Sequence, residues 1–164
     1  MEIEKAGVIL PQWEMLPDIG LYMDQVITLM ERTFSPALPK GEITKSMVNN
    51  YVKVGLVPRP AGKKYDREHL AVLLMICVFK QALSMENIAQ ILKSLCADGV
   101  QKGYNHFRET AELLEDSALE GCLGIGKESV EEQALRSGLM ASLSTVRTSR
   151  LLEELRNRTH EKGA

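Results

Sequence analysis

The chain has 164 residues, of which 45% are hydrophobic and 26% are charged, and its formal net charge is −2. These proportions are ordinary for a soluble globular protein, and the length fits one domain, or one small domain with an appendage. The longest apolar run, residues 70–79, is ten residues long and too short to span a bilayer. Because the acidic N-terminus also lacks the apolar core of a signal peptide, we expect a cytoplasmic protein with no membrane partner.

Charge is distributed unevenly along the chain. Residues 1–39 carry a net charge of −4 and residues 109–133 a net charge of −7. Residues 40–80 hold eight basic and three acidic residues, a net charge of +5. An evenly spread negative charge would argue against nucleic acid, but a concentrated basic block is what a DNA-binding module needs. The alternative interpretation is an ordinary solvated charged surface.

The first part of the chain, residues 1–40, is predicted to be an arm followed by one helix. The arm, residues 1–17, has apolar anchors at Val8, Ile9, Leu10 and Trp13. The helix is expected over about residues 21–33, and its predicted inner face consists of Tyr22, Val26, Leu29 and Met30. A proline-rich linker, residues 35–41, follows. All six prolines lie at or before Pro60, so the rest of the chain is free to be helical, and we predict an all-α fold.

The next helix has one polar face and one apolar face. Thr44 is placed to cap its N-terminus, and Gly55 supplies a stop at its C-terminus. At about 100° per residue, one arc carries the polar residues Lys45, Ser46, Asn49, Asn50 and Lys53. The opposite arc carries the apolar residues Met47, Val48, Tyr51, Val52 and Val54. One face is therefore predicted to pack, and the other to present amide and ammonium groups to solvent.

A basic, proline-bounded loop and two capped helices come next. The loop, residues 56–65, contains Pro58, Pro60, Gly62 and the pair Lys63 and Lys64, a composition typical of a small β-wing or a tight loop. Asp66 is placed to cap a helix that reaches about residue 81 and is apolar on every side, as in a buried central element. Ser84 is placed to cap another, whose predicted buried stripe is Met85, Ile88, Ala89, Ile91, Leu92 and Leu95.

The remaining chain, residues 98–164, is predicted to be helical. Residues 101–119 place Tyr104, Phe107, Ala111, Leu114 and Ala118 at alternating three- and four-residue spacing. A loop at 121–126 precedes a last helix over about residues 128–159, in which Leu135, Leu139, Leu143 and Val146 align. Leu151, Leu152 and Leu155 point elsewhere, so this helix either bends near residues 147–150 or contacts two different surfaces.

The order of these features resembles the DNA-binding head of MerR-type regulators. That head consists of a capped helix with a Tyr, a Gly-Leu pair, prolines, a basic wing ending in Tyr, and a capped buried helix. The residues that carry the resemblance are Thr44, Tyr51, Gly55, Leu56, Pro58, Pro60, Lys63, Lys64, Tyr65, Asp66, Leu70, Leu73, Ile76, Leu83, Ser84, Met85, Glu86 and Ile88. Together with LYMDQV at residues 21–26, this segment is similar to the YkrK-like family of bacterial proteins, a domain of unknown function. The resemblance implies a winged helix-turn-helix with a short wing over residues 41–97, and a homodimer formed through the C-terminal helices.

A DNA-binding transcriptional regulator is therefore the leading hypothesis, with double-stranded DNA as the partner. Lys45, Lys53, Arg59, Lys63 and Lys64 would neutralise phosphates, while Asn49 and Asn50, with Ser46 beside them, would reach base edges. The alternative for the amides is that they are only exposed polar residues. The alternative function is a helical protein-interaction module that keeps the fold and binds a protein partner through the acidic face at 109–133.

Three further patterns give little support to an enzyme, a metal or a cofactor. Cys77, Cys96 and Cys122 are widely spaced, with no CxxC or Cys/His pair, which indicates reduced thiols rather than ligands. The sequence GCLGIGK at 121–127 fits part of a phosphate-binding loop, but Glu128 stands where Ser or Thr would hold magnesium. The carboxylates of residues 109–120 have no histidine or apolar pocket beside them. We expect no catalytic residues and no bound cofactor.

Overall fold

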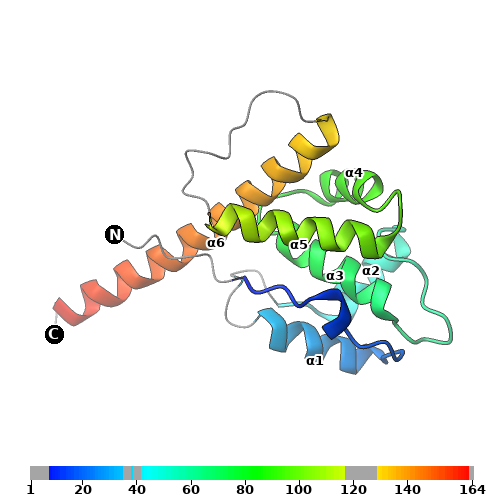
Figure 1. Ribbon diagram of the computed structural model, residues 1–164. Helices are drawn as coiled ribbons and strands as arrows, with labels where there is room; N and C mark the ends of the chain where they lie inside the picture. Colours follow the sequence, from blue (N-terminus) through cyan, green and yellow to red (C-terminus); the bar gives the residue numbers. More distant parts are fainter. Residues whose placement is uncertain (1–7, 35–37, 39–41, 117–128, 163–164) are drawn as a thin grey trace.

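The computed structural model describes residues 8–34, 38, 42–116 and 129–162. Within them the protein is all-helical, with no β-strand, as the sequence predicts (Figure 1). A short 3-10 turn, η1 (Trp13–Met15), precedes the helices. These are α1 (Met23–Phe34), α2 (Lys45–Lys53), α3 (Arg67–Phe79), α4 (Met85–Leu95), α5 (Val100–Asp116) and α6 (Val130–Lys162). No described helix is both long and apolar enough to cross a bilayer.

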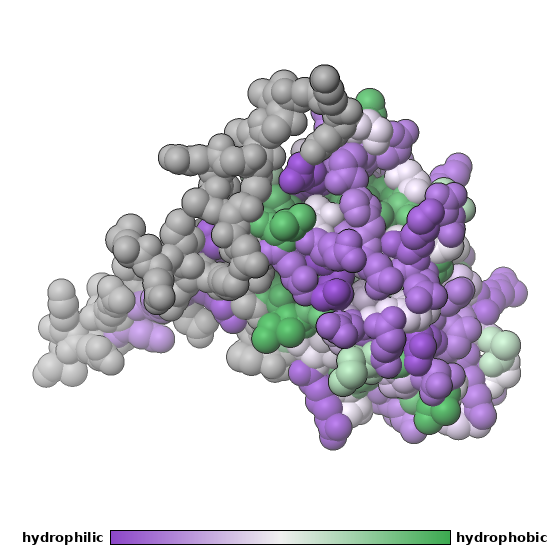
Figure 2. Space-filling model, viewed as in Figure 1, coloured by the Kyte–Doolittle hydropathy of each residue, from purple (hydrophilic) through white to green (hydrophobic). Residues whose placement is uncertain are grey.

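Helix α3 forms the centre of the hydrophobic core. Every residue from His69 to Phe79 is buried, which confirms the prediction of a central element that is apolar all round. Helices α5 and α6 pack directly against α3, and α4 packs against both α5 and α6. In Figure 1, α3 and α5 lie in the middle of the molecule, with α1 on one side and α4 on the other. In the view of Figure 2, hydrophilic side chains cover most of the described surface, and hydrophobic ones occur in small separate patches.

Three predicted N-caps fix where the central helices begin. The hydroxyl of Thr44 accepts a hydrogen bond from the backbone N–H of Met47 at 3.2 Å. The carboxylate of Asp66 accepts one from the N–H of His69 at 3.1 Å, and the hydroxyl of Ser84 accepts one from the N–H of Asn87 at 3.3 Å. Such caps depend only on residues three positions apart, so the sequence suffices to predict them.

The N-terminal arm is tied to the body as expected, with one exception. Val8, Leu10 and Trp13 are buried, and the hydroxyl of Tyr104 donates to the carbonyl of Pro11 at 2.7 Å. The prediction of Ile9 as an anchor is wrong, since its side chain is 80% exposed. In extended backbone successive side chains point to opposite sides, so the burial of Val8 and Leu10 turns Ile9 outward.

Three other apolar residues predicted to be buried are exposed. Tyr22 precedes the first turn of α1 and is 55% exposed, although Val26 and Met30 of that helix are fully buried. Val54 lies one residue beyond α2 and is 62% exposed. Ala89 is exposed because it lies on the flank of the stripe that Ile88 and Leu92 bury in α4. In each case the residue lies at the end or the edge of an amphipathic face.

The first half of helix α6 packs on the body through one face, and its second half extends away from the body (Figure 1). Leu135, Leu139, Leu143 and Val146 are all buried, as their alignment predicts. The helix continues without a break through residues 147–150, and beyond them Leu151 is 45% exposed. The side chains of Leu152 and Leu155 lie outside the described residues, as does the loop predicted at 121–126.

Candidate nucleic-acid interface

All eight residues predicted to contact DNA lie on the surface. Five of them occupy the outward face of α2 and three lie in the loop that follows it: Lys45, Ser46, Asn49, Asn50, Lys53, Arg59, Lys63 and Lys64 are all exposed. The opposite face of α2 holds the helix on the core through Val48 and Tyr51, which are 0% and 4% exposed. Burial, with the charge of Cys77 adding to it, raises the pKa of Tyr51 to about 12, so this phenol stays neutral and packs.

The loop after α2 ends in a tight two-residue turn that points two lysines outward. Gly62 and Lys63 both have positive φ, +57° and +61°, and the N–H of Lys64 donates to the carbonyl of Ala61 at 3.0 Å. This combination is that of a type I′ turn, which connects hairpin strands. The turn is anchored by an antiparallel bridge in which Leu21 and Tyr65 exchange two hydrogen bonds of 2.8 Å. The structure thus has a tight hairpin-like loop at the place where the sequence predicts a small wing or a tight loop.

The start of α1 brings the polar face of α2 and this turn together. The ammonium of Lys64 lies over the ring of Tyr22, 5.3 Å from its centroid. Two residues further along, the carboxylate of Asp24 forms an ion pair with Lys45 in the first turn of α2. Because Tyr22 and Asp24 are only two residues apart in the chain, Lys45 and Lys64 both lie against the start of α1.

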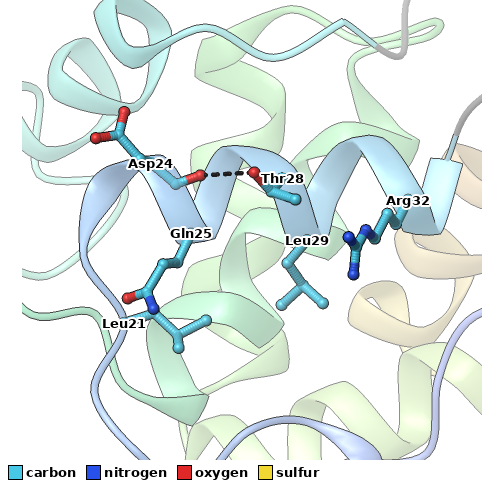
Figure 3. A pocket seen from close by; sticks show the side chains of 6 residues that line it. All are labelled: Leu21, Asp24, Gln25, Thr28, Leu29 and Arg32. Carbon is cyan, nitrogen blue, oxygen red and sulfur yellow. Dashed lines mark hydrogen bonds between the residues drawn. The ribbon is translucent and has the colours of Figure 1, made fainter.

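Asp24 also marks one end of a shallow pocket on the outer face of α1. Figure 3 shows that pocket, with Asp24 at one end, Arg32 at the other, and Leu29 between them.

Local sequence patterns give no signal for the roles of Tyr22 and Asp24. Each meets a lysine distant in sequence, and that contact depends on how α1 sits against α2.

Two cations of the basic block serve the fold instead of the surface. The Arg67 guanidinium donates to the carbonyl of Leu16 at 3.0 Å and lies 5.8 Å from the ring of Trp13. The ammonium of Lys80 donates to the carbonyl of Glu42 at 3.1 Å. Among the described residues, by contrast, Lys53, Arg59 and Lys63 have no ion-pair partner. Within the described part of the basic block, the exposed cations without an ion-pair partner are therefore Lys53 of α2 and the three cations of the loop.

The base of the loop is joined to α3 by a reciprocal cap. Asp66 accepts from the backbone of His69, and the His69 ring lies 2.6 Å from the same carboxylate oxygen and 5.5 Å from the ring of Tyr65. Burial opposes ionisation of Asp66, but the hydrogen bonds from the backbone and side chain of His69 outweigh it and lower the carboxyl pKa. This cap therefore stabilises α3 above the ordinary carboxyl pKa, and its contribution is lost as the pH falls through the lowered value.

The acidic segment and the cysteines contribute no described cluster of ligands. In the part of 109–133 that is described, Glu112 pairs with Arg108, and Glu132 lies 2.6 Å from the ring nitrogen of His106. Residues 117–128, with Cys122 and GCLGIGK, lie outside the described residues. Burial raises the pKa of Cys77 to about 12, and no described group of three His, Cys, Asp or Glu side chains has the geometry of a metal site.

A glycine at position 63 would stabilise the protein. Lys63 has a φ of +61°, a left-handed conformation that costs an L-residue about 1–2 kcal/mol. Glycine avoids this cost but adds about 0.4–1 kcal/mol of conformational entropy to the unfolded chain. We expect Lys63→Gly to raise the free energy of unfolding by about 0.8 kcal/mol in urea titrations, the difference between the midpoints of these two ranges. An unchanged or lower stability would contradict the strained geometry of the turn.

The family comparison covers this surface and most of the core. A family model described as a domain of unknown function (DUF1836) matches residues 11–111, which run from the arm before η1 into α5. No curated protein and no solved structure matches the chain significantly. Since the match spans more than half of the chain, the protein belongs to the DUF1836 family.

Proposed function

We propose that this protein is a DNA-binding transcriptional regulator of MerR-like type that contacts duplex DNA through α2 and the turn 61–64. The observation that carries the proposal is that Lys45 of α2 and Lys64 of the turn both contact the start of α1. Exposed Asn49 and Asn50 follow Lys45 on the same helix. A groove-binding module requires exposed basic groups near a helix that presents amides.

In this proposal the helices correspond to a helix-turn-helix with a short wing. Helix α1 is the supporting helix, α2 the reading helix, and the turn 61–64 the wing. The second half of α6, which extends away from the body and exposes Leu151, is the segment through which two copies would pair. A dimer would present two reading helices, as palindromic half-sites require.

The two kinds of contact have different chemical roles. Lys45, Lys53, Arg59, Lys63 and Lys64 neutralise phosphates, which gives affinity and register but reads no sequence. A side-chain amide can pair with the N6 and N7 positions of adenine, for about 1–3 kcal/mol of discrimination per good pair. Asn49 and Asn50 are therefore assigned to base reading, with Ser46 beside them.

The backbone at Lys63 is a second supporting observation. Position 63 is the second central residue of a type I′ turn, where Gly, Asn or Asp is the favourable choice. A lysine held there at positive φ places a cation at the tip of the loop at a cost in stability. Strain of this kind often occurs at functional sites.

The salt dependence of binding to a random duplex tests the phosphate contacts. The apparent association constant should fall steeply with salt, because neutralised phosphates release counterions. Replacing both lysines of the turn, Lys63→Ala with Lys64→Ala, should reduce the slope of log K against log salt by up to about two units. Fluorescence anisotropy of a labelled duplex measures this slope directly.

A matched variant separates a local effect from a change in net charge. Lys93 and Lys102 are exposed on α4 and α5, outside the proposed surface. The pair Lys93→Ala with Lys102→Ala removes the same charge and should leave the slope unchanged. If the two double variants have equal slopes, the turn does not bind phosphate.

A second variant tests whether Asp24 competes with phosphate for Lys45. Replacing the carboxylate, Asp24→Asn, frees the ammonium of Lys45 and removes a negative charge from the proposed surface. We expect tighter binding to duplex and a salt slope steeper by up to about one unit. The control Glu31→Gln removes an exposed charge further along α1 and should change neither quantity. Equal effects from both variants would show that only net charge matters.

The alternative, a helical protein-interaction module, predicts different behaviour. A monomer with no affinity for duplex at low salt would favour this alternative, in which the acidic face at 109–133 binds a protein partner. A dimer that binds nonspecific DNA and is released by salt would favour the regulator.

A further inference from the structure

An apolar groove separates the segment after α2 from helices α4 and α5. Its volume is about 450 Å³, within the range of about 300–1,000 Å³ typical of small-molecule sites. One wall is formed by Val54, Leu56 and Pro58 of the segment that leads from α2 to the turn 61–64. Val72 of α3 and Leu92 of α4, which are 5% and 6% exposed, lie deepest.

The apolar surface of this groove is accessible to a ligand. Val54 is 62% exposed although it lines the groove, and Ala89 of the facing helix is exposed as well. The volume is open to solvent and large enough for an aliphatic chain. Water in such a groove is displaced favourably by an apolar group, because the apolar surface is then removed from contact with water.

The charges around the groove favour an anionic group at one end. Lys93 is the one charged residue that lines it, and among the described residues its ammonium has no ion-pair or hydrogen-bond partner. Val100, the first residue of the 17-residue helix α5, lines the groove too, so the positive end of that helix dipole lies at the groove. The thiol of Cys96 is neutral, because burial and then the charge of Glu68, a residue that does not line the groove, raise its pKa.

We propose that this groove is a binding site for a small amphipathic carboxylate, with its aliphatic chain against Val54, Leu56 and Val72 and its carboxylate at Lys93. The site is separate from the proposed DNA surface and does not depend on it. A bound molecule would nevertheless contact the segment that joins α2 to the turn 61–64. A ligand of this class would therefore affect how α2 and the turn 61–64 are oriented relative to each other.

Decanoate below its micellar concentration is the probe, and amide chemical shifts of the ¹⁵N-labelled full chain are the readout. Saturable shifts should centre on Gly55, Ala89 and Val100. A bulky residue in the groove, Ala89→Trp, should abolish the saturable shifts, whereas the same change at exposed Ala97, outside the groove, should leave them intact. Absence of saturable shifts, or equal behaviour of the two tryptophan variants, would overturn the proposal.

Decanol tests the role of the carboxylate. The neutral alcohol offers the same chain without the charge, so Lys93→Gln should leave its affinity unchanged. The same variant should weaken decanoate about two- to fivefold, as for a solvent-exposed ion pair. Lys63→Gln, which removes an exposed cation outside the groove, is the control and should not affect decanoate. If Lys93→Gln changes both ligands equally, or neither, the assignment of the anionic end is wrong.

Discussion

Reversing two cations of the proposed surface, Lys53→Glu with Lys63→Glu, is expected to weaken binding to duplex DNA by at least about 60-fold at 0.1 M salt. Each neutralised phosphate adds about 0.9 to the slope of log K against log salt, or about a factor of eight at that concentration. Removing two such contacts gives about 60-fold, and the new carboxylates add repulsion. Both lysines are exposed and have no described ion-pair partner, so the loss of binding should occur without unfolding.

A control with the same change in net charge distinguishes an effect of the proposed DNA surface from an effect of net charge alone. Lys93→Glu with Lys102→Glu reverses two exposed cations on α4 and α5. Binding by this variant should stay within about threefold of the original protein, since long-range effects of exposed charges are screened beyond about 10 Å at 0.1 M salt. Comparable losses in the two variants would show that no particular surface binds DNA.

Phe107→Ala is expected to lower the free energy of unfolding by about 3–5 kcal/mol, the range for a fully buried aromatic side chain. Phe107 is 0% exposed, and its ring meets that of Phe79 edge to face, with centroids 5.2 Å apart and planes at 70°. The loss combines the transfer of a large apolar side chain with the cavity left between α5 and α3. Thermal unfolding should show a decrease in Tm of about 6–20 °C.

Leu113→Ala is the matched control on the same helix. Leu113 is 60% exposed, so its truncation should change stability by no more than about 0.5 kcal/mol. If Phe107→Ala costs as little as this control, α5 does not pack on α3 as described. The comparison also tests the central position of α3, because Phe79 is the last residue of that helix.

Local rules were sufficient to predict the helices. Thr44, Asp66 and Ser84 each cap a helix through a residue three positions on, and Gly55, with a φ of +77°, follows the end of α2. Helical periodicity likewise located the buried face of α6. These features depend on sequence neighbours within one turn, so tertiary packing had little opportunity to override them.

The parts that sequence could not predict depend on distant contacts. Tyr22 is an aromatic residue next to an amphipathic helix, which favours burial, yet it lies outside beneath the ammonium of Lys64. The pairing of Asp24 with Lys45 joins two helices across a linker whose path no local pattern specifies. The structural role of Arg67 could likewise not be predicted, because its contact with Trp13 depends on where the N-terminal arm lies. Counting charges therefore overestimated the number of cations available on the surface. The eight candidate residues, however, are all exposed, as the sequence predicts.

Chemical-shift mapping with a random duplex shows directly whether α2 and the turn 61–64 bind DNA. The ¹⁵N-labelled chain is titrated at low salt with a short duplex of mixed sequence. We expect shifts concentrated at residues 45–53 and 61–64, reversed by added salt. Shifts confined to α5 and α6, or no shifts at a duplex excess in low salt, would contradict it.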